Sequence, residues 1–377
     1  MAIGIRSGAA ITDLDSIFDL IISGMTPAAN TNIRYSASLT DLSARYAPLS
    51  YGASASATGI TTGSGKNDLN TIFAAINTSY LLKTLLFAAG STNNSYSGAV
   101  NTASLLNAST NTSSTTTSIV GGVAYASGTG NATKGLIGGG INSPDTLLQG
   151  ILIYTYSSAT WATPSSGASR MYEFMAAAST SSIAGFYAGL NISTIQQSGC
   201  YTYTYSSDTQ AFTTYYNGSS GDVAGWQAAF SDGTYAYIGG GEQNNSSTTV
   251  LLRNNFSSGW TTMTSMPSIH DLQPGCAGNT AYGIWAGGLN GSALSSSVRF
   301  NVSANTWTST GSLSVARYYL AGAPTNKNAY FGGGGNTGTT VYSTTDVVNF
   351  STGTSSSGTN LAQGNVSTLG AAGWGGY

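Results

Sequence analysis

Charge is the scarcest feature of this 377-residue sequence. Asp, Glu, Lys and Arg make up 6% of it, whereas a typical globular domain has about 25%. The formal net charge is −2, which excludes strong electrostatic attraction to nucleic acid or to an anionic membrane. No apolar run reaches the roughly 18 residues of a membrane-spanning helix. We therefore expect no nucleic-acid partner and no membrane insertion.

Side chains that bind metals or act as catalysts are also few. The sequence has one histidine, His270, and two cysteines, Cys200 and Cys276, which fit no zinc or copper motif. His270 directly precedes Asp271, and adjacent residues rarely meet in the geometry of a catalytic triad. We predict no metal site, no cofactor and no catalytic residue. The two cysteines are interpreted as small buried residues, with a single bridge as the alternative.

Glycine, in contrast, is abundant and clusters after short apolar runs, as in "GLIGGG" (135–140), "YIGGG" (237–241) and "YFGGGG" (330–335). The apolar residue before each small-residue pair recurs at intervals of 46 to 51 residues. These six anchors are Phe87, Ile137, Tyr187, Ile238, Trp285 and Phe331. Self-similarity at a period near 50 indicates a β-propeller.

Each repeat is expected to contain four short strands. The innermost is rich in small residues, and we place it at 122–127, 174–179, 226–231, 274–278 and 319–324. The second ends in the glycines, where backbones approach closely. The third and fourth flank a turn followed by a bulky residue, which is predicted to pack between adjacent blades. These bulky residues are Trp161, Gln210, Trp260 and Trp307.

The two ends of the repeat region complement each other. The first repeat begins at "KTLLFAAG" (83–90) and lacks an innermost strand, while "STLGAAG" (367–373) is an innermost strand without a partner. We predict that the two pair in one blade, because ring closure removes an open sheet edge. The predicted fold is therefore an all-β, six-bladed propeller over residues 83–377.

The glycine pair after an apolar strand and the later aromatic resemble the kelch repeat family. The resemblance covers residues 83–377 and implies a kelch-like propeller. The pattern departs from the family at "FAAG" (87–90) and at "YAGL" (187–190), where the glycine pair is incomplete, and at Gln210, which replaces a tryptophan.

Residues 1–82 form a separate segment with an internal echo. "DLDSIFDLI" (13–21) and "DLNTIFAAI" (68–76) share apolar residues at helical spacing. These are Leu14, Ile17, Phe18, Leu69, Ile72 and Phe73, which we predict to be attachment residues on short helices. A helical appendage packed against the propeller is the alternative. The segments resemble parts of bacteriophage tail-fibre and other virion appendage proteins, which implies other virion proteins as partners, a homo-oligomer and a location in the virus particle. A secreted or extracellular location is the alternative.

Loops at one end of the propeller are the predicted binding surface. In a propeller, the links from the second to the third strand and from blade to blade lie on one face. Here these links are rich in amides, hydroxyls and aromatic rings, which suit neutral sugars. The candidate ligand-binding residues are Tyr172, Glu173, Trp226, Glu242, Asn244, His270, Arg317 and Tyr318.

The predicted function is non-enzymatic adhesion of a virus particle, through host-surface glycan or protein. The first alternative is a secreted or cell-surface scaffold, such as a subunit of an extracellular filament or layer. The second is a polysaccharide-degrading enzyme that uses Glu173 or Glu242. For each aromatic or loop residue, a purely structural place in a blade core or a solvated loop also remains open.

Overall fold

The computed structural model describes residues 84–373 and the backbone of 5–6 and 33–34. Within 84–373 it leaves out residues 94, 120, 143–145, 148–149, 165–170, 192, 194, 219–220, 337–339, 365 and 368. The chain divides into two compact units, Met1–Ser79 and Tyr80–Tyr377. In the first, β1 (Ile5–Arg6) pairs in parallel with β2 (Ile33–Arg34). The six predicted attachment residues, Leu14, Ile17, Phe18, Leu69, Ile72 and Phe73, lie outside the described residues.

The second unit is all-β. The helical segments among its described residues are two short 3-10 turns, η2 (Tyr96–Gly98) and η3 (Tyr216–Gly218). Its innermost strands are β7 (Ser127–Gly130), β13 (Ala176–Ser179), β18 (Ala228–Ser231), β24 (Gly275–Gly278), β30 (Ala321–Pro324) and β34 (Gly370–Ala372). The second strands are β3 (Thr84–Ala88), β8 (Lys134–Gly138), β14 (Ile183–Leu190), β19 (Ala236–Gly239), β25 (Tyr282–Ala286) and β31 (Asn328–Gly332). Each of the six predicted anchors lies on one of these second strands and is buried.

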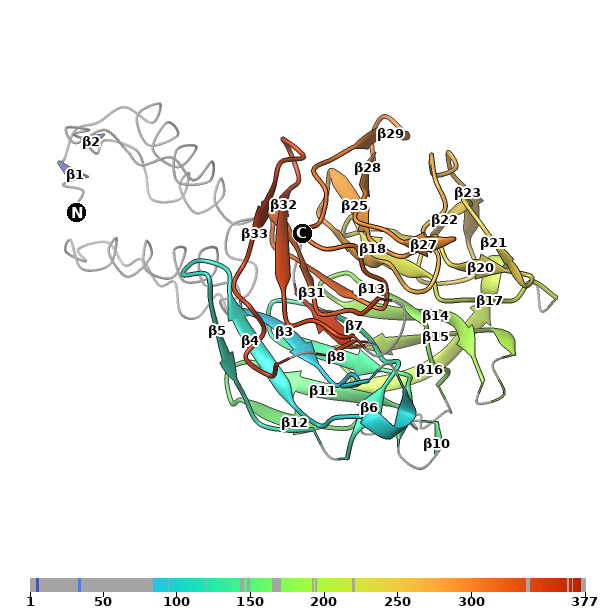
Figure 1. Ribbon diagram of the computed structural model, residues 1–377, viewed down its shortest axis with the longest axis horizontal. Helices are drawn as coiled ribbons and strands as arrows, with labels where there is room; N and C mark the ends of the chain where they lie inside the picture. The colour runs from blue at the N-terminus through green and yellow to red at the C-terminus, as the bar shows by residue number, and fades with distance from the viewer. Residues whose placement is uncertain are drawn as a thin grey trace. The chain divides into compact units, whose positions relative to one another are not determined.

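The outer half of each sheet is a hairpin. The third strands are β4 (Ala103–Asn107), β11 (Ile151–Thr155), β15 (Gln196–Thr204), β22 (Leu251–Asn254), β28 (Ser297–Asn301) and β32 (Thr345–Asn349). The fourth strands are β5 (Thr112–Thr115), β12 (Thr160–Ala162), β16 (Thr209–Tyr215), β23 (Trp260–Thr262), β29 (Thr306–Ser309) and β33 (Ser355–Ser357). Neighbouring strands in these sheets run antiparallel. The result is a propeller-like arrangement of small sheets (Figure 1).

The ends of the unit pair as predicted. The C-terminal strand β34 lies antiparallel against β3, with Phe87 opposite Ala371 and Ala88 opposite Gly370. The innermost strands contact one another in the cycle β34, β7, β13, β18, β24, β30 and back to β34. The expectation of a closed ring, with the C-terminal strand in the first sheet, is confirmed.

The expectation of six separate blades is wrong. Five four-stranded sheets stand alone, whereas β13 to β16 belong to a seven-stranded sheet. The cause is the length of β15, whose residue Gln197 pairs with Ala224 of β17 (Ala224–Gly225). Through β17 the sheet continues into β20 (Glu242–Gln243) and β21 (Ser246–Ser247). Along the chain, these two strands come between the second and third strands of the following sheet.

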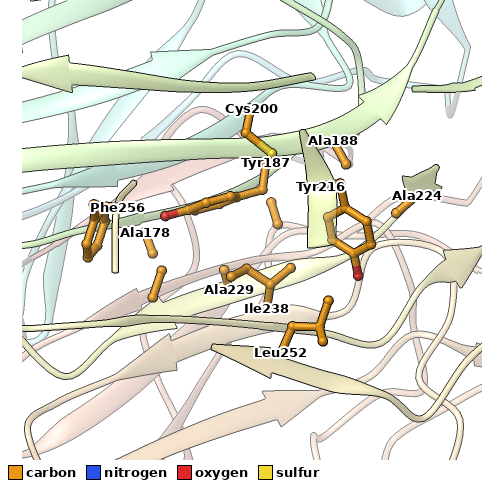
Figure 2. Packing of buried hydrophobic residues seen from close by; sticks show 12 residues of the cluster. Ala178, Tyr187, Ala188, Cys200, Tyr216, Ala224, Ala229, Ile238, Leu252 and Phe256 are labelled. Carbon is orange, nitrogen blue, oxygen red and sulfur yellow. The ribbon is translucent and has the colours of Figure 1, made fainter. Parts of the chain in front are cut away.

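Side chains packed between neighbouring sheets form the core. Figure 2 shows one such cluster, in which Tyr187 and Cys200 of one sheet face Ile238 and Leu252 of the next. The predicted place of the bulky outer residues between sheets is confirmed where their contacts are given. Trp161 Nε1, for example, donates to the carbonyl oxygen of Thr117 in the preceding repeat, at 2.8 Å. Both cysteines, Cys200 and Cys276, are buried and free, as interpreted from the sequence.

One innermost strand lies elsewhere than predicted. The second repeat forms it at Ser127–Gly130, and not at 122–127. Val123–Ala124 form the separate strand β6, which pairs with β9 (Ile141–Asn142) and through it with β10 (Thr146–Leu147). Tyr125, with a φ of +59°, separates β6 from β7, because a left-handed residue cannot continue a strand.

Candidate functional site

The segments between second and third strands and those between consecutive sheets meet at one end of the ring. Glu173 pairs with Leu190, Asp271 with Leu289, and Tyr318 with Gly335. In each pair the first residue belongs to a link between sheets; the second belongs to a link within a sheet or, for Leu190, ends the second strand β14. β26 (Leu289–Asn290) and β27 (Ser292–Ala293) form a small hairpin there. We call the surface formed by these two sets of segments the link surface; its predicted gathering at one end is confirmed.

The glycine pairs hold this end together. Gly240 has a φ of +70°, and a Cβ atom there would lie 2.6 Å from the carbonyl oxygen of His270. The next residue, Gly241, donates its N–H to that same oxygen at 2.8 Å. The fifth sheet repeats the arrangement, since Gly288 N donates to Arg317 O at 2.9 Å. The glycines are therefore needed where these two sheets bind the link that leads to the next one.

A ring of large side chains covers the central channel at the link end. Five residues lie two positions before an innermost strand and have φ values from +50° to +59°: Tyr125, Phe174, Trp226, Gln273 and Tyr319. We call them the axial cluster. Ring centroids of Tyr125 and Phe174 are 4.4 Å apart, and those of Phe174 and Tyr319 are 5.5 Å apart. Gln273 Nε2 donates to Ala126 O at 3.2 Å, which links distant repeats.

The axial cluster is held in a conformation that non-glycine residues rarely adopt. Such residues cost about 1–3 kcal/mol each and persist only where their surroundings fix them. Backbone bonds between successive members do so here: Phe174 N donates to Tyr125 O at 3.0 Å, and Gln273 N donates to Trp226 O at 2.8 Å. The cluster is thus a built cap on the channel.

The channel itself is almost filled. Its cavity measures about 20 Å³ and is lined by small residues of all six innermost strands, among them Gly128, Ala178, Ala229, Ala277, Gly322 and Ala371. That volume holds about one water molecule. A sugar or a cofactor therefore has no room inside this channel.

Three of the predicted site residues are fully buried and shape the fold. Arg317 Nη2 lies 2.8 Å from Asp346 Oδ2, and both side chains are inaccessible. His270 Nδ1 donates to Gly287 O at 2.7 Å, and burial lowers the pKa of this imidazole. Glu173 is also fully buried. The prediction that they face a ligand at the channel mouth is wrong, because all three side chains are inaccessible.

Glu242 belongs to a polar group near the outer part of the link surface. Gln196 Nε2 donates to Glu242 Oε2 at 2.9 Å, and Gln196 Oε1 accepts from Asn245 N at 2.9 Å. Partial burial, and to a smaller extent the nearby Asp271, raise the pKa of Glu242, while the Gln196 bond opposes this. Asp271 in turn accepts from Ser247 Oγ at 2.6 Å.

The remaining predicted residues are spread over the link surface. Trp226 is half-buried in the axial cluster, 5.8 Å from the ring of Phe174. Half-buried Tyr318 touches Tyr319 at 4.7 Å between ring centroids. Tyr172 packs edge-on against Tyr201, and Asn244 is exposed. The structure thus brings Trp226 and Tyr318 to the axial cluster, and leaves Tyr172, Glu242 and Asn244 outside it.

Sequence reasoning missed Tyr125, Phe174, Gln273 and Tyr319. Their signal is present in the repeats, since a large residue precedes five of the six innermost strands by two positions. The predicted strands at 122–127, 174–179 and 319–324 include Tyr125, Phe174 and Tyr319, which hides this signal, and Gln273 lies just before the predicted strand at 274–278.

Three further observations concern metal binding, membrane crossing and thiol reactivity in the described part of the chain. No group of three or more His, Cys, Asp or Glu side chains within it is placed to hold a metal ion. Within the same residues, no helix has the length and apolar character required to cross a bilayer. Burial raises the pKa of the Cys200 thiol to about 12, so that thiol is not a nucleophile at neutral pH.

Comparison with known proteins identifies the fold alone. No protein-family model and no curated protein matches the sequence. Among solved structures, the one described as "Structure of YjhT" is similar, with a TM-score of 0.56 and 14% sequence identity. The match covers 69% of this chain and 91% of that chain. The second unit is therefore a β-propeller-like domain.

Proposed function

We propose that this chain is a non-enzymatic adhesion protein of a virus particle. In this proposal the link surface binds glycan or protein on a host surface, and residues 1–82 attach the chain to the particle. The observation that carries the proposal is the axial cluster. Its large side chains pack at the end of a ring whose central cavity measures about 20 Å³, which supports recognition on an outer surface. We further propose that β13 to β16 act as a sixth, kelch-like blade.

The environment of the polar candidates supports adhesion over catalysis. His270 and Arg317 have partners that keep them in structural roles, and neither is accessible. The accessible part of the link surface is formed by hydroxyl, amide and tyrosine side chains, such as Asn244 and Tyr318. Neutral polar groups on a rigid scaffold suit recognition of uncharged sugars or polar protein surfaces.

The proposal is tested by glycan-array binding of the intact chain, combined with analysis of released products. We expect retention on at least one host-surface glycan or protein without new reducing ends. Tyr318→Ala should weaken retention about tenfold, equivalent to about 1.4 kcal/mol. Thr306→Ala serves as the matched control, because Thr306 is exposed and begins β29 at the end opposite the link surface. Absence of any retention contradicts adhesion.

One observation favours hydrolysis of a polysaccharide as a second candidate. Glu242 has a raised pKa and an acidic neighbour, Asp271, as pairs of catalytic carboxylates often do. If the wild-type chain releases reducing ends and Glu242→Gln abolishes the release, this candidate replaces adhesion.

The particle assignment has its own test. After density-gradient fractionation of native material, the full chain should sediment with virus particles. A chain lacking residues 1–82 should remain folded and stay at the top of the gradient. Recovery of the full chain as free protein, or in an extracellular filament or layer, contradicts the assignment to a particle.

A further inference from the structure

The third repeat carries an exposed aromatic surface that sets it apart. Among the described residues the large apolar side chains that are exposed are Ile195, Phe212 and Tyr215, at 59%, 46% and 46%. All three belong to the hairpin of β15 and β16 or to the residue just before it. Exposed rings are costly in water, so two on one short strand suggest a function.

These rings are part of a continuous series. Tyr172 and Tyr201 have ring centroids 6.1 Å apart, Tyr201 and Phe212 5.7 Å, and Phe212 and Tyr215 5.2 Å. Each pair meets edge to face, at interplanar angles of 60°, 80° and 68°. This geometry is favourable for aromatic pairs and fixes the outer rings against the buried Tyr201. We call the four residues the aromatic ladder.

A β-bulge places both exposed rings on one face. Phe212 lies opposite Tyr201, but the register shifts at the next pair, so that Thr214 lies opposite Cys200 and Tyr215 opposite Gly199. Residues three positions apart in a regular strand point to opposite faces. Because of the extra residue in β16, Tyr215 lies on the same face of the hairpin as Phe212 and Tyr201. Gly199 leaves space for Tyr172, since a Cβ atom there would lie 2.9 Å from that ring.

The hairpin that carries most of the ladder has almost no charge. Between residues 196 and 216 the sequence has one charged side chain, Asp208. Asp208 lies in the turn between β15 and β16, where it accepts a hydrogen bond from Tyr203 and faces Lys134 at 3.8 Å. Gln197 is two residues from Gly199 and four from Tyr201 on β15, and its amide is uncharged. A neutral ligand matches this surface better than a charged one.

The size of the exposed surface favours a sugar over a protein. A stable protein interface buries about 800 Å² on each partner. Two half-exposed rings, each of about 150–250 Å² in total, offer far less than that. They match the extent of one or two hexose units, whose C–H faces pack against aromatic rings.

We propose that the aromatic ladder, through Phe212 and Tyr215, binds a neutral oligosaccharide by ring stacking. The inference rests on the proposed adhesion function and names its ligand class. It extends the binding surface from Tyr172 at the link end outward along β15 and β16. The neighbouring amide of Gln197 supplies hydrogen bonds to the sugar.

Affinity electrophoresis of the intact chain in gels containing dextran, galactomannan or xyloglucan tests the proposal. We expect at least one of these neutral polysaccharides to slow the wild-type chain. Phe212→Ala and Tyr215→Ala should each raise the dissociation constant at least tenfold, and Tyr215→Phe should bind nearly as wild type. Ile195→Ala, which removes the third exposed apolar side chain, is the matched control and should change little. Unchanged melting temperatures confirm that the variants are folded.

Several results would overturn the proposal. One is a wild-type chain that no neutral polysaccharide slows. Another is a loss of polysaccharide binding in Ile195→Ala equal to the loss in Phe212→Ala, which would indicate a general apolar patch. A third is self-association of the wild-type chain that is lost in Phe212→Ala. That result would assign the exposed rings to a contact between copies of this chain.

The outcome is separable from that of the adhesion proposal. If the array retains the chain and ladder variants bind as wild type, adhesion stands and the ladder inference is wrong. If the array retains nothing and a polysaccharide gel shows ladder-dependent retardation, the ladder binds sugar and host adhesion through the link surface is wrong.

Discussion

Buried polar side chains at the link end stabilise particular turns of the chain. Arg317 donates through Nη2 to Phe331 O at 3.2 Å, in addition to its ion pair with Asp346. Asp346 Oδ1 also accepts from Ser314 N at 3.0 Å. The pair therefore joins the link before β30 to strands β31 and β32. Each charge of this pair is therefore compensated by its partner and is sensitive to its loss.

Removing one partner of this pair should destabilise the propeller strongly. Asp346→Ala leaves the Arg317 guanidinium buried and uncompensated, so we expect the free energy of unfolding to fall by about 3–5 kcal/mol. Urea denaturation measures the change. The double variant Arg317→Met/Asp346→Ala should lose less than the single one, because no charge stays buried. A single variant within about 0.5 kcal/mol of wild type would contradict a tightly buried pair.

His270 should make stability depend on pH. Its folded pKa is lowered by burial, so the folded state resists protonation while the unfolded state binds a proton near its ordinary value of about 6.5. The contribution is complete above that value and is lost as pH falls below it. We expect the wild-type melting temperature to fall between about pH 6.5 and pH 5.5, and His270→Gln to show a flatter profile over the same range. Parallel profiles of the two proteins would contradict the lowered pKa.

At the scale of strands, the repeat pattern predicts most of the fold. The six anchors lie on the observed second strands, and four of the five proposed innermost ranges contain the whole observed innermost strand. These features follow from local chemistry, since apolar residues at fixed spacing are buried and small residues face a narrow channel. Gln210 keeps the place of a tryptophan on β16 and is buried, although neither of its amide atoms has a hydrogen-bond partner in the described part of the chain.

What the sequence does not predict depends on conformation and on contacts between distant repeats. The small residues that mark an innermost strand do not show the left-handed conformation of Tyr125, which moves the strand to 127–130. The continuation of one sheet from β15 into β20 requires two loops to meet in space. The sequence also does not predict that some candidate ligand-binding residues are buried, for a related reason. His270 and Arg317 are on the predicted links, but whether a side chain points outward or inward depends on the next sheet.

For the propeller as a whole, closure of the ring determines which residues share a surface. Clusters of buried side chains occur between consecutive sheets, and one joins the two ends of the unit through Phe87, Tyr330, Val366 and Leu369. The axial cluster depends on the same closure, since the ring centroids of Tyr125 and Tyr319, which belong to separate repeats, are 6.3 Å apart. Without the pairing of β34 with β3, the cap on the channel and the link surface lose their geometry.

Hydrogen exchange of backbone amides in the intact chain tests this closure most directly. The measurement compares residues 84–88 and 370–372 with β24 and β25, a pair of strands far from either end of the unit. A closed ring predicts that the terminal strands exchange as slowly as β24 and β25, because β34 is hydrogen-bonded within a sheet. Exchange of residues 370–372 at the rate of a frayed terminus would contradict the closed ring and the surfaces that depend on it.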